Sequence, residues 1–283
     1  MKDTFFPKKK VLNVRGKIWV MQSPVVMGIL NLTPNSFYDG GKFDSADLIL
    51  EQAARLYQDG AFIIDLGAYS SRPGAEEVTT EEEWHRLKGI IKTIKKQFPD
   101  KLLSVDTFRS EIASRSLDEG VDIINDISGG SLDNNIWTVT AQHQAPYIAM
   151  HMRGTPSTMQ QMTHYSNLPI NVLDYFIEVT KQARRVGLRD LILDPGFGFA
   201  KTTEQNYELL DQLDVLKPLQ SLVLVGLSRK SMIYKPLGTG PSEALNGTTA
   251  LHMAALLKGV DILRVHDVKE ALESITLYHK IRG

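Results

Sequence analysis

Eight short apolar segments, each ending abruptly in polar residues, limit what this chain can fold into more than any other feature. They are Val25–Leu30, Ala61–Asp65, Leu102–Val105, Asp122–Ile124, Tyr147–Met150, Leu191–Leu193, Leu222–Val225 and Asp261–Val265. Because the segments are short and rich in Val, Ile and Leu, they are typical of strands buried on both faces in a parallel sheet. Helix-length amphipathic stretches separate them. Eight strand–helix units predict one closed (β/α)8 TIM barrel of the α/β class.

The polar residues that follow these segments are the first candidates for function, since barrel enzymes carry their active sites at the C-terminal ends of the strands. In chain order they are Asn31, Gly67–Arg72, Asp106, Asn125–Asp126, His151, Asp194, Ser228–Lys230 and His266. Two connections that begin here, Leu32–Gly41 and Ala68–Val78, are long and rich in glycine. We expect them to act as lids that order only when a ligand is bound.

Domain boundaries follow from the same pattern. Residues 1–24 are predicted to form an N-terminal extension, with a small hairpin over Val11–Val20 that closes the bottom of the barrel, and residues 25–283 form the barrel itself. The stretch Glu243–Lys258 is apolar nearly all round, and a helix without a polar face is normally buried. Either a subunit interface or the neighbouring helices would bury it, and the sequence favours neither.

Composition excludes several classes of function. A formal net charge of −1 gives no electrostatic footprint for a nucleic acid partner. The absence of cysteine excludes disulfides, cysteine metal sites and thiol catalysis. No apolar run approaches the roughly 18 residues of a membrane span, and no signal-like segment follows the first lysine. We therefore expect a cytoplasmic enzyme that acts on small molecules and does not bind a membrane.

Three strand-end residues, Asp106, Asn125 and Asp194, point to the kind of ligand. A carboxylate buried at a strand end is costly unless a donor satisfies it. One such residue would be explained by neighbouring backbone amides, but three on the same rim favour a ligand rich in N–H donors. A flat heterocycle with an amino–imino edge fits this set.

Cationic residues follow the last two strands. The first group is Ser228–Ser231 and the second is Arg264–Asp267. Barrel phosphate sites commonly use these two loops, so the pair favours anion binding over surface placement. Ser71 and Arg72 offer a hydroxyl and a guanidinium suited to another phosphate oxygen. The histidines show no metal-ligand spacing, but a hard cation held partly by substrate oxygens and one amide stays open.

The sequence of motifs resembles one known family. MGILNLTPNSFYDGG (Met27–Gly41) and DLGAYSSRPGAEEV (Asp65–Val78) resemble the NxTPDSFxDGG and DxGGESTRPGA signatures of the dihydropteroate synthases, a family of pterin-binding enzymes. SVDTFR, IINDISGG, AMHMRGTPSTMQ, ILDPGFGFAKT, GLSRKS and RVHDV match the later blocks in order. The resemblance runs from about Val25 to the end of the chain.

The resemblance implies a transferase that joins 6-hydroxymethyl-7,8-dihydropterin diphosphate to 4-aminobenzoate, a target of sulfonamides and a homodimer. Asp106, Asn125, Asp194 and Lys230 would hold the pterin. Ser71, Arg72, Arg264 and His266 would bind the diphosphate, and Asn31 would bind Mg²⁺. Ser71, Pro73, Phe199 and Ser231 would border the 4-aminobenzoate. Asp106, Lys230, Arg264 and His266 are the expected catalytic set.

Three positions depart from the family pattern: Asn35 and Tyr69 replace the usual Asp and Glu, and Ser71 replaces Thr. Ser71 keeps a hydroxyl, but nothing in the sequence explains Tyr69. Two rival functions follow. A pterin-dependent methyltransferase of the corrinoid type would share the fold and need no diphosphate clamp. A catalytically silent pterin-binding paralogue would be supported only by these departures.

Overall fold

A computed structural model describes residues 10–21, 23–32, 45–69 and 78–282 of the chain. Most of the two connections predicted to be lids lies outside these residues. Three predicted site residues, Ser71, Arg72 and Pro73, therefore lie outside the described residues. So does Asn35, one of the positions that depart from the family pattern.

Eight parallel strands form a closed barrel in the order β10-β3-β4-β5-β6-β7-β8-β9. The strands are β3 Val25–Asn31, β4 Ile63–Gly67, β5 Leu102–Asp106, β6 Ile123–Asp126, β7 Tyr147–Met150, β8 Leu191–Asp194, β9 Leu222–Val225 and β10 Ile262–Val265. Each predicted apolar segment overlaps one strand, and the strands are almost entirely buried because helices cover the barrel outside and side chains fill it inside. The predicted fold class is confirmed.

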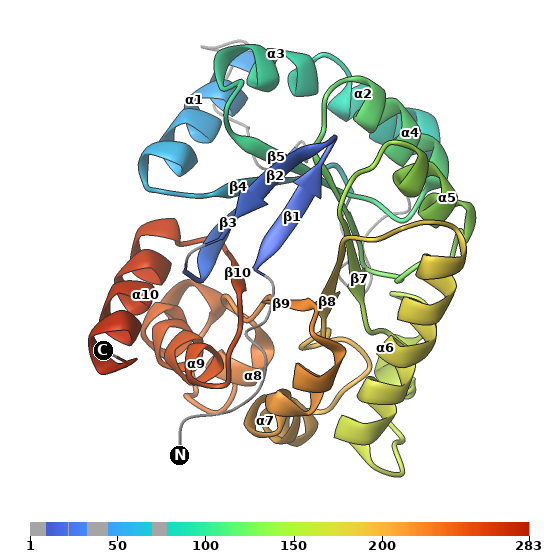
Figure 1. The fold of residues 1–283 in the computed structure, drawn as a ribbon. Coiled ribbons are helices and arrows are strands. Elements are labelled where there is room, and N and C mark those ends of the chain that lie inside the picture. The colour runs from blue at the N-terminus through green and yellow to red at the C-terminus, as the bar shows by residue number, and fades with distance from the viewer. Residues whose placement is uncertain (1–9, 22, 33–44, 70–77, 283) are drawn as a thin grey trace.

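Helices surround the barrel, as Figure 1 shows. They are α1 Ser45–Gln58, α2 Thr80–Leu87, α3 Ile90–Gln97, α4 Ser110–Asp118, α5 Asn135–Gln142, α6 Leu168–Arg185, α7 Thr203–Asp211, α8 Ser231–Tyr234, α9 Leu245–Leu257 and α10 Val268–Arg282. Local signals set their starts: Thr79 caps α2, and Thr202 with Gln205 forms a capping box at α7. Short 3₁₀ helices lie at Met159–Gln161, Leu213–Leu219 and Pro241–Glu243.

The N-terminal hairpin joins β1 Val11–Val14 to β2 Lys17–Val20. Its turn places Arg15 and Gly16 at positive φ, where glycine is favoured. Leu12, Val14 and Met21 pack with the first residues of the barrel strands, and in Figure 1 the hairpin lies across the ring of strands. The predicted closure of the barrel bottom is confirmed.

The register of the strands brings polar residues to one level at the opposite end. Asn31 of β3 pairs with Gly67 of β4, Gly67 with Asp106 of β5, and Asp106 with Asn125 of β6. Asp65 lies two residues before Gly67, on the same side of its strand and one layer deeper. The barrel strands themselves therefore bring three residues of the predicted site, Asn31, Asp106 and Asn125, to one level.

Helix α9 corresponds to the apolar stretch predicted between Glu243 and Lys258. Its residues Thr248, His252, Ala255 and Leu256 are buried, and it packs against α8 and α10. Leu257 nevertheless stays 47% exposed. Neighbouring helices thus cover only part of this surface, and the subunit interface stays a prediction. Among the described residues no helix is both long and apolar enough to cross a membrane.

Candidate active site

A small cavity opens at the C-terminal ends of the barrel strands. It is lined by Asp106, Asn125, Ile127, Met150, Asp194, Phe199, Gly226, Lys230 and Arg264. Its volume is about 30 Å³. The structure therefore brings six of the predicted site residues together around one small cavity.

Arg264 is the central cation of this cavity. Its Nε donates to Asp65 Oδ2 at 2.7 Å, and its Nη2 donates to Asp106 Oδ2 at 2.9 Å. Burial alone would lower the pKa of the guanidinium, but Asp65 and Asp106 outweigh it and raise that pKa. Two donors are used, so three of its five N–H groups remain for a ligand.

Asp65 is a site residue that the strand-end pattern missed. It is fully buried within β4, and its Oδ2 accepts hydrogen bonds from both Arg264 and Asn125 Nδ2, the latter at 2.9 Å. Its Oδ1 has no partner among the described residues. The only signal in the sequence is a carboxylate at the end of an otherwise apolar run.

Asp106 shares the Arg264 guanidinium with Asp65. Burial raises the pKa of Asp106 to about 7, Arg264 opposes that rise, and the neighbouring Asp65 carboxylate adds to it. The Tyr69 hydroxyl donates to Asp106 Oδ1 at 3.1 Å. Two carboxylates beside one cation leave a net negative charge in a buried place, so a ligand that donates N–H bonds would be favoured here.

Asn125 presents a defined acceptor to the cavity. Because its Nδ2 donates to Asp65, the amide carbonyl oxygen is left on the other side of the side chain. Asn125 is almost fully buried and lines the cavity. It can accept a hydrogen bond from a ligand without losing its bond to Asp65.

Asp194 and Lys230 form the opposite wall. Burial raises the pKa of Asp194 and lowers the pKa of Lys230 to about 8, and each charge partly offsets the burial of the other. Gly196 N donates to Asp194 Oδ1 at 2.8 Å, and the Lys230 ammonium donates to the Phe197 carbonyl. Lys230 Nζ also lies 4.8 Å from the centre of the Phe199 ring. The predicted cation therefore lies over the predicted aromatic ring, and the carboxylate lines the same cavity.

Lys201 and His151 lie beside this wall, and sequence reasoning had not assigned Lys201 a role. Lys201 Nζ bonds to His151 Nδ1 at 3.0 Å, Gly196 O at 3.0 Å and Phe199 O at 3.1 Å. Burial lowers the pKa of Lys201 to about 7 and also lowers the pKa of His151. The pair holds the loop that carries Phe199 against the end of β7. A lysine inside the apolar stretch FGFAKT is the signal that could have found it.

Of the predicted anion-binding residues that the structure describes, Arg264 lines the cavity and His266 does not. His266 Nδ1 is 3.0 Å from Ser228 Oγ, and the His266 side chain is exposed. Arg229 is not part of the cavity, since it makes two hydrogen bonds to Asp267, at 2.6 and 2.9 Å. Ser231 begins α8 and is half-buried, but it does not line the cavity.

Asn31 is exposed at the end of β3, and its Oδ1 would lie 3.0 Å from a Cβ at position 67. Glycine at position 67 leaves room for that amide. No cluster of three or more histidine, aspartate or glutamate side chains that could hold a metal occurs in the described part of the chain. One amide oxygen fits a hard cation that takes its other ligands from substrate oxygens and water.

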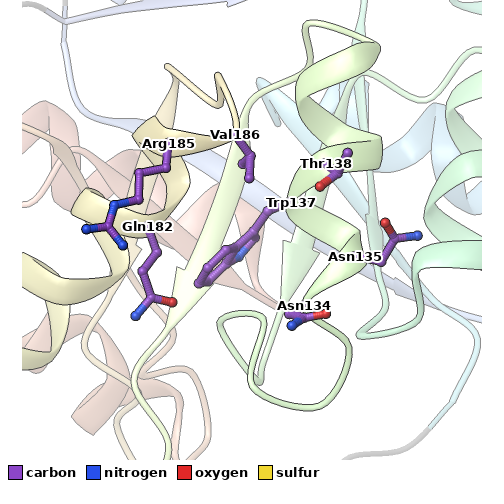
Figure 2. Close-up of a pocket in the computed structure, with 7 residues that line it drawn as sticks. All are labelled: Asn134, Asn135, Trp137, Thr138, Gln182, Arg185 and Val186. Carbon is purple, nitrogen blue, oxygen red and sulfur yellow. The ribbon is translucent and has the colours of Figure 1, made fainter.

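A second cavity, of about 330 Å³, lies outside the barrel. Figure 2 shows its lining side chains, which come from around α5 and the C-terminal end of α6: Asn134, Asn135, Trp137, Thr138, Gln182, Arg185 and Val186. It contains no carboxylate and none of the strand-end residues. Of these two cavities, the smaller one at the strand ends is the one that the predicted site residues line.

The closed (β/α)8 barrel thus gathers two aspartates, an asparagine and a lysine at one cavity, a set that offers acceptors and one cationic donor. Comparison with known proteins identifies the class further. Residues 27–266 match the pterin binding enzyme family. Dihydropteroate synthase from Synechocystis sp. is 48% identical over 253 residues, which cover 88% of this chain and 87% of that protein.

Solved structures agree. A Yersinia pestis dihydropteroate synthase with a sulfonamide drug complex superposes with a TM-score of 0.89 at 37% identity, covering 96% of this chain and 99% of that one. A Xanthomonas albilineans dihydropteroate synthase with 4-aminobenzoic acid gives 0.89 at 34% identity, covering 97% and 99%. The chain therefore belongs to the pterin binding enzyme family and, within it, to the dihydropteroate synthases, which are transferases.

Proposed function

We propose that this chain condenses 6-hydroxymethyl-7,8-dihydropterin diphosphate with 4-aminobenzoate, which gives 7,8-dihydropteroate and diphosphate for folate synthesis. The observation that carries the proposal is the convergence of Asp106, Asn125, Asp194 and Lys230 on one cavity. These side chains offer three acceptors and one cationic donor. That set complements the amino–imino edge and the ring carbonyl of a pterin.

The pterin grip assigns one role to each side chain. Asp194 accepts from the amino–imino edge, while the bond from Gly196 N to its Oδ1 keeps the carboxylate in place. The carbonyl oxygen of Asn125 and the carboxylate of Asp106 accept from further N–H groups. Lys230 donates to the ring carbonyl with an N–H group that its bond to the Phe197 carbonyl leaves unused.

The diphosphate needs cations at the rim. Arg264 has unused N–H groups beside its bonds to Asp65 and Asp106. His266 lies two residues after Arg264 in the chain. Ser71 and Arg72, which lie outside the described residues, would complete the clamp. Asn31 would hold Mg²⁺, which when bound supplies Lewis-acid stabilisation of the charge on the leaving diphosphate.

The reaction follows from this arrangement. The bond between the pterin methylene carbon and the diphosphate oxygen breaks first, with its electron pair leaving on the diphosphate. Cations at the rim stabilise that charge, and the carboxylate of Asp194 stabilises the positive charge left on the pterin methylene. The aryl amine then attacks the methylene carbon and releases a proton. Phe199 and Ser231, with Ser71 and Pro73, would hold the amine at this carbon.

Sulfonamides should compete with 4-aminobenzoate for that position, as supported by the Yersinia pestis relative solved with a sulfonamide drug. A steady-state assay with both substrates and Mg²⁺ tests the function. Formation of dihydropteroate and diphosphate supports it. A corrinoid methyltransferase or a silent paralogue would bind the pterin and give no product, and that result would overturn the proposal.

We propose that the enzyme is a homodimer that works in the cytoplasm. An apolar stripe supports the dimer: Ala250, Met253, Ala254 and Leu257 recur at helical spacing on α9, and Leu277 and Ile281 of α10 are 59% and 62% exposed. Light scattering of Leu257→Glu should give monomers. The matched change Ile18→Glu, on the hairpin, should leave the dimer intact, and dissociation by both changes alike would contradict this interface.

A further inference from the structure

Tyr69 connects the segment after β4 to the wall of the active-site cavity. Its hydroxyl donates to Asp106 Oδ1 at 3.1 Å. Its ring packs edge-on against Phe108, with ring centres 5.4 Å apart, in an apolar cluster that also includes Phe199. The ring is thus held by packing while the hydroxyl reaches a proposed substrate ligand.

The carboxylate of Asp106 is consequently held from two directions. Tyr69, beyond the end of β4, donates to Oδ1, and Arg264, on β10, donates to Oδ2. Two donors on different oxygens fix the plane of the carboxylate, because rotation about its bond to Cβ would break both bonds. Losing one of them would leave the group free to turn about the other.

The surrounding charges make this second donor important. Asp106 faces Arg264 from β10, Asp65 from β4 and Asp126 from β6, while Asp194 and Lys230 line the far wall of the cavity. Burial raises the pKa of Asp106, and the bond from Tyr69 opposes that rise. Burial and the nearby carboxylate raise the pKa of Tyr69 itself well above its ordinary value, so its phenol stays a donor at every working pH.

We propose that Tyr69 is a positioning residue: its phenol, together with Arg264, fixes the orientation of the Asp106 carboxylate so that Asp106 accepts an N–H group of the pterin. This inference rests on the proposed role of Asp106 in binding the pterin. Tyr69 stands where the family pattern usually has Glu, so in this chain a permanent donor takes the place of a second carboxylate.

The test removes one hydroxyl and keeps the ring. Tyr69→Phe is compared with Tyr57→Phe. The Tyr57 hydroxyl donates to Leu102 O at 3.0 Å, and Leu102 begins β5, the strand that Asp106 ends. Calorimetry measures the binding of pterin diphosphate from pH 5.5 to 8.5. Tyr69→Phe should weaken binding about tenfold at neutral pH, since hydrogen bonds to charged groups are the strong ones. The loss should shrink toward pH 8.5, and Tyr57→Phe should bind like the parent.

A second readout needs no substrate. Carbon-13 NMR follows the titration of the Asp106 carboxyl in the free protein, with its signal assigned by its loss in Asp106→Asn. Tyr69→Phe should move the midpoint upward by roughly one pH unit, a tenfold change in the ionisation equilibrium, and Tyr57→Phe should not move it. Unchanged binding at every pH together with an unchanged midpoint would overturn the proposal.

Asp106→Asn distinguishes a failure of the proposed role of Asp106 in binding the pterin from a failure of the inference on Tyr69. If Asp106→Asn binds pterin diphosphate as the parent does, the proposed role of Asp106 fails and the inference on Tyr69 fails with it. If Asp106→Asn loses binding and Tyr69→Phe does not, only the role of Tyr69 is wrong. In the Asp106→Asn background, adding Tyr69→Phe should cause no further loss of binding.

Discussion

At the lower end of the barrel, where the strands begin, Leu12 and Val14 of the hairpin pack against Ile63 and Leu102 in a cluster of apolar side chains. At the upper end, where the same strands finish, Asp65, Asp106 and Asp194 are buried beside the half-buried cations Lys230 and Arg264. The lower end gains free energy from burial, whereas the upper end buries charges that burial disfavours. The barrel thus separates the apolar residues that stabilise it from the charged residues that we propose bind the ligand.

Asp190 and Asp194 show the difference within a few residues. Asp190 precedes β8 at the lower end and accepts a hydrogen bond from Asn13 N of the hairpin at 3.1 Å. Asp194 ends the same strand at the upper end, where burial raises its pKa and it lines the cavity. The same residue type therefore fastens the hairpin at one end and is available to a ligand at the other.

Removing the central cation should have the largest effect. Arg264→Met leaves the Asp65 and Asp106 carboxylates buried without their ion pair, which costs about 3–5 kcal/mol of the free energy of unfolding. Urea unfolding at pH 8 measures this. The control Arg229→Met removes the more exposed pair with Asp267 and should cost less than about 1 kcal/mol. Equal losses would mean that the buried ion pairs of Arg264 contribute no more to the free energy of unfolding than the more exposed pair of Arg229 with Asp267.

A cavity at the lower end should cost stability and spare function. Leu102 is buried at the start of β5, the strand that ends in Asp106. Leu102→Ala should lower the free energy of unfolding by about 2–5 kcal/mol. Where the protein remains folded, kcat/KM should equal that of the parent. A large fall in kcat/KM would show that the two ends are coupled.

The pH dependence of stability distinguishes the ends in another way. The pKa of Asp106 rises from 3.8 to about 7 on folding. Between these pH values the folded protein keeps a proton that the unfolded chain has released, so the free energy of unfolding falls as pH rises. Asp106→Asn removes this decline. As pH rises from 5 to 8, the free energy of unfolding of the variant minus that of the parent should therefore increase by ~2 kcal/mol. Parallel unfolding profiles for the two proteins would show that Asp106 does not titrate in this range.

Sequence reasoning predicted the fold, and the meeting of Asp106, Asn125 and Asp194 at one cavity, because both depend on short-range patterns. Apolar runs reveal the strands, and a polar residue directly after a run, such as Asp194, lies at the strand end whatever its partners. Asp65 escaped because it ends an apolar run, and its partner Arg264 is 199 residues away.

The role of Tyr69 and the bond between Lys201 and His151 escaped for a related reason. Each depends on which loops the closed barrel brings together, and no local spacing encodes that. The sequence marked Tyr69 as unusual, and only the contact with Asp106 gives the residue a physical role.

A smaller effect is expected at the proposed amine site. Phe199 lines the cavity and its ring lies beside Lys230. Phe199→Leu keeps an apolar side chain and loses the aromatic face, so the KM for 4-aminobenzoate should rise roughly three- to tenfold. Binding of pterin diphosphate, measured separately by calorimetry, should stay within twofold of the parent. A larger effect on the pterin than on 4-aminobenzoate would place Phe199 in the other half of the site.

Asp190, just before β8, and Asp194, at the end of β8, test the central claim, that the upper end of the barrel binds the pterin. Asp194→Asn and Asp190→Asn make the same chemical change at opposite ends of one strand, and calorimetry measures the binding of pterin diphosphate to each. We predict that Asp194→Asn weakens binding by roughly ten- to a hundredfold, while Asp190→Asn binds like the parent. Unchanged binding in Asp194→Asn, or equal losses in both variants, would contradict the account.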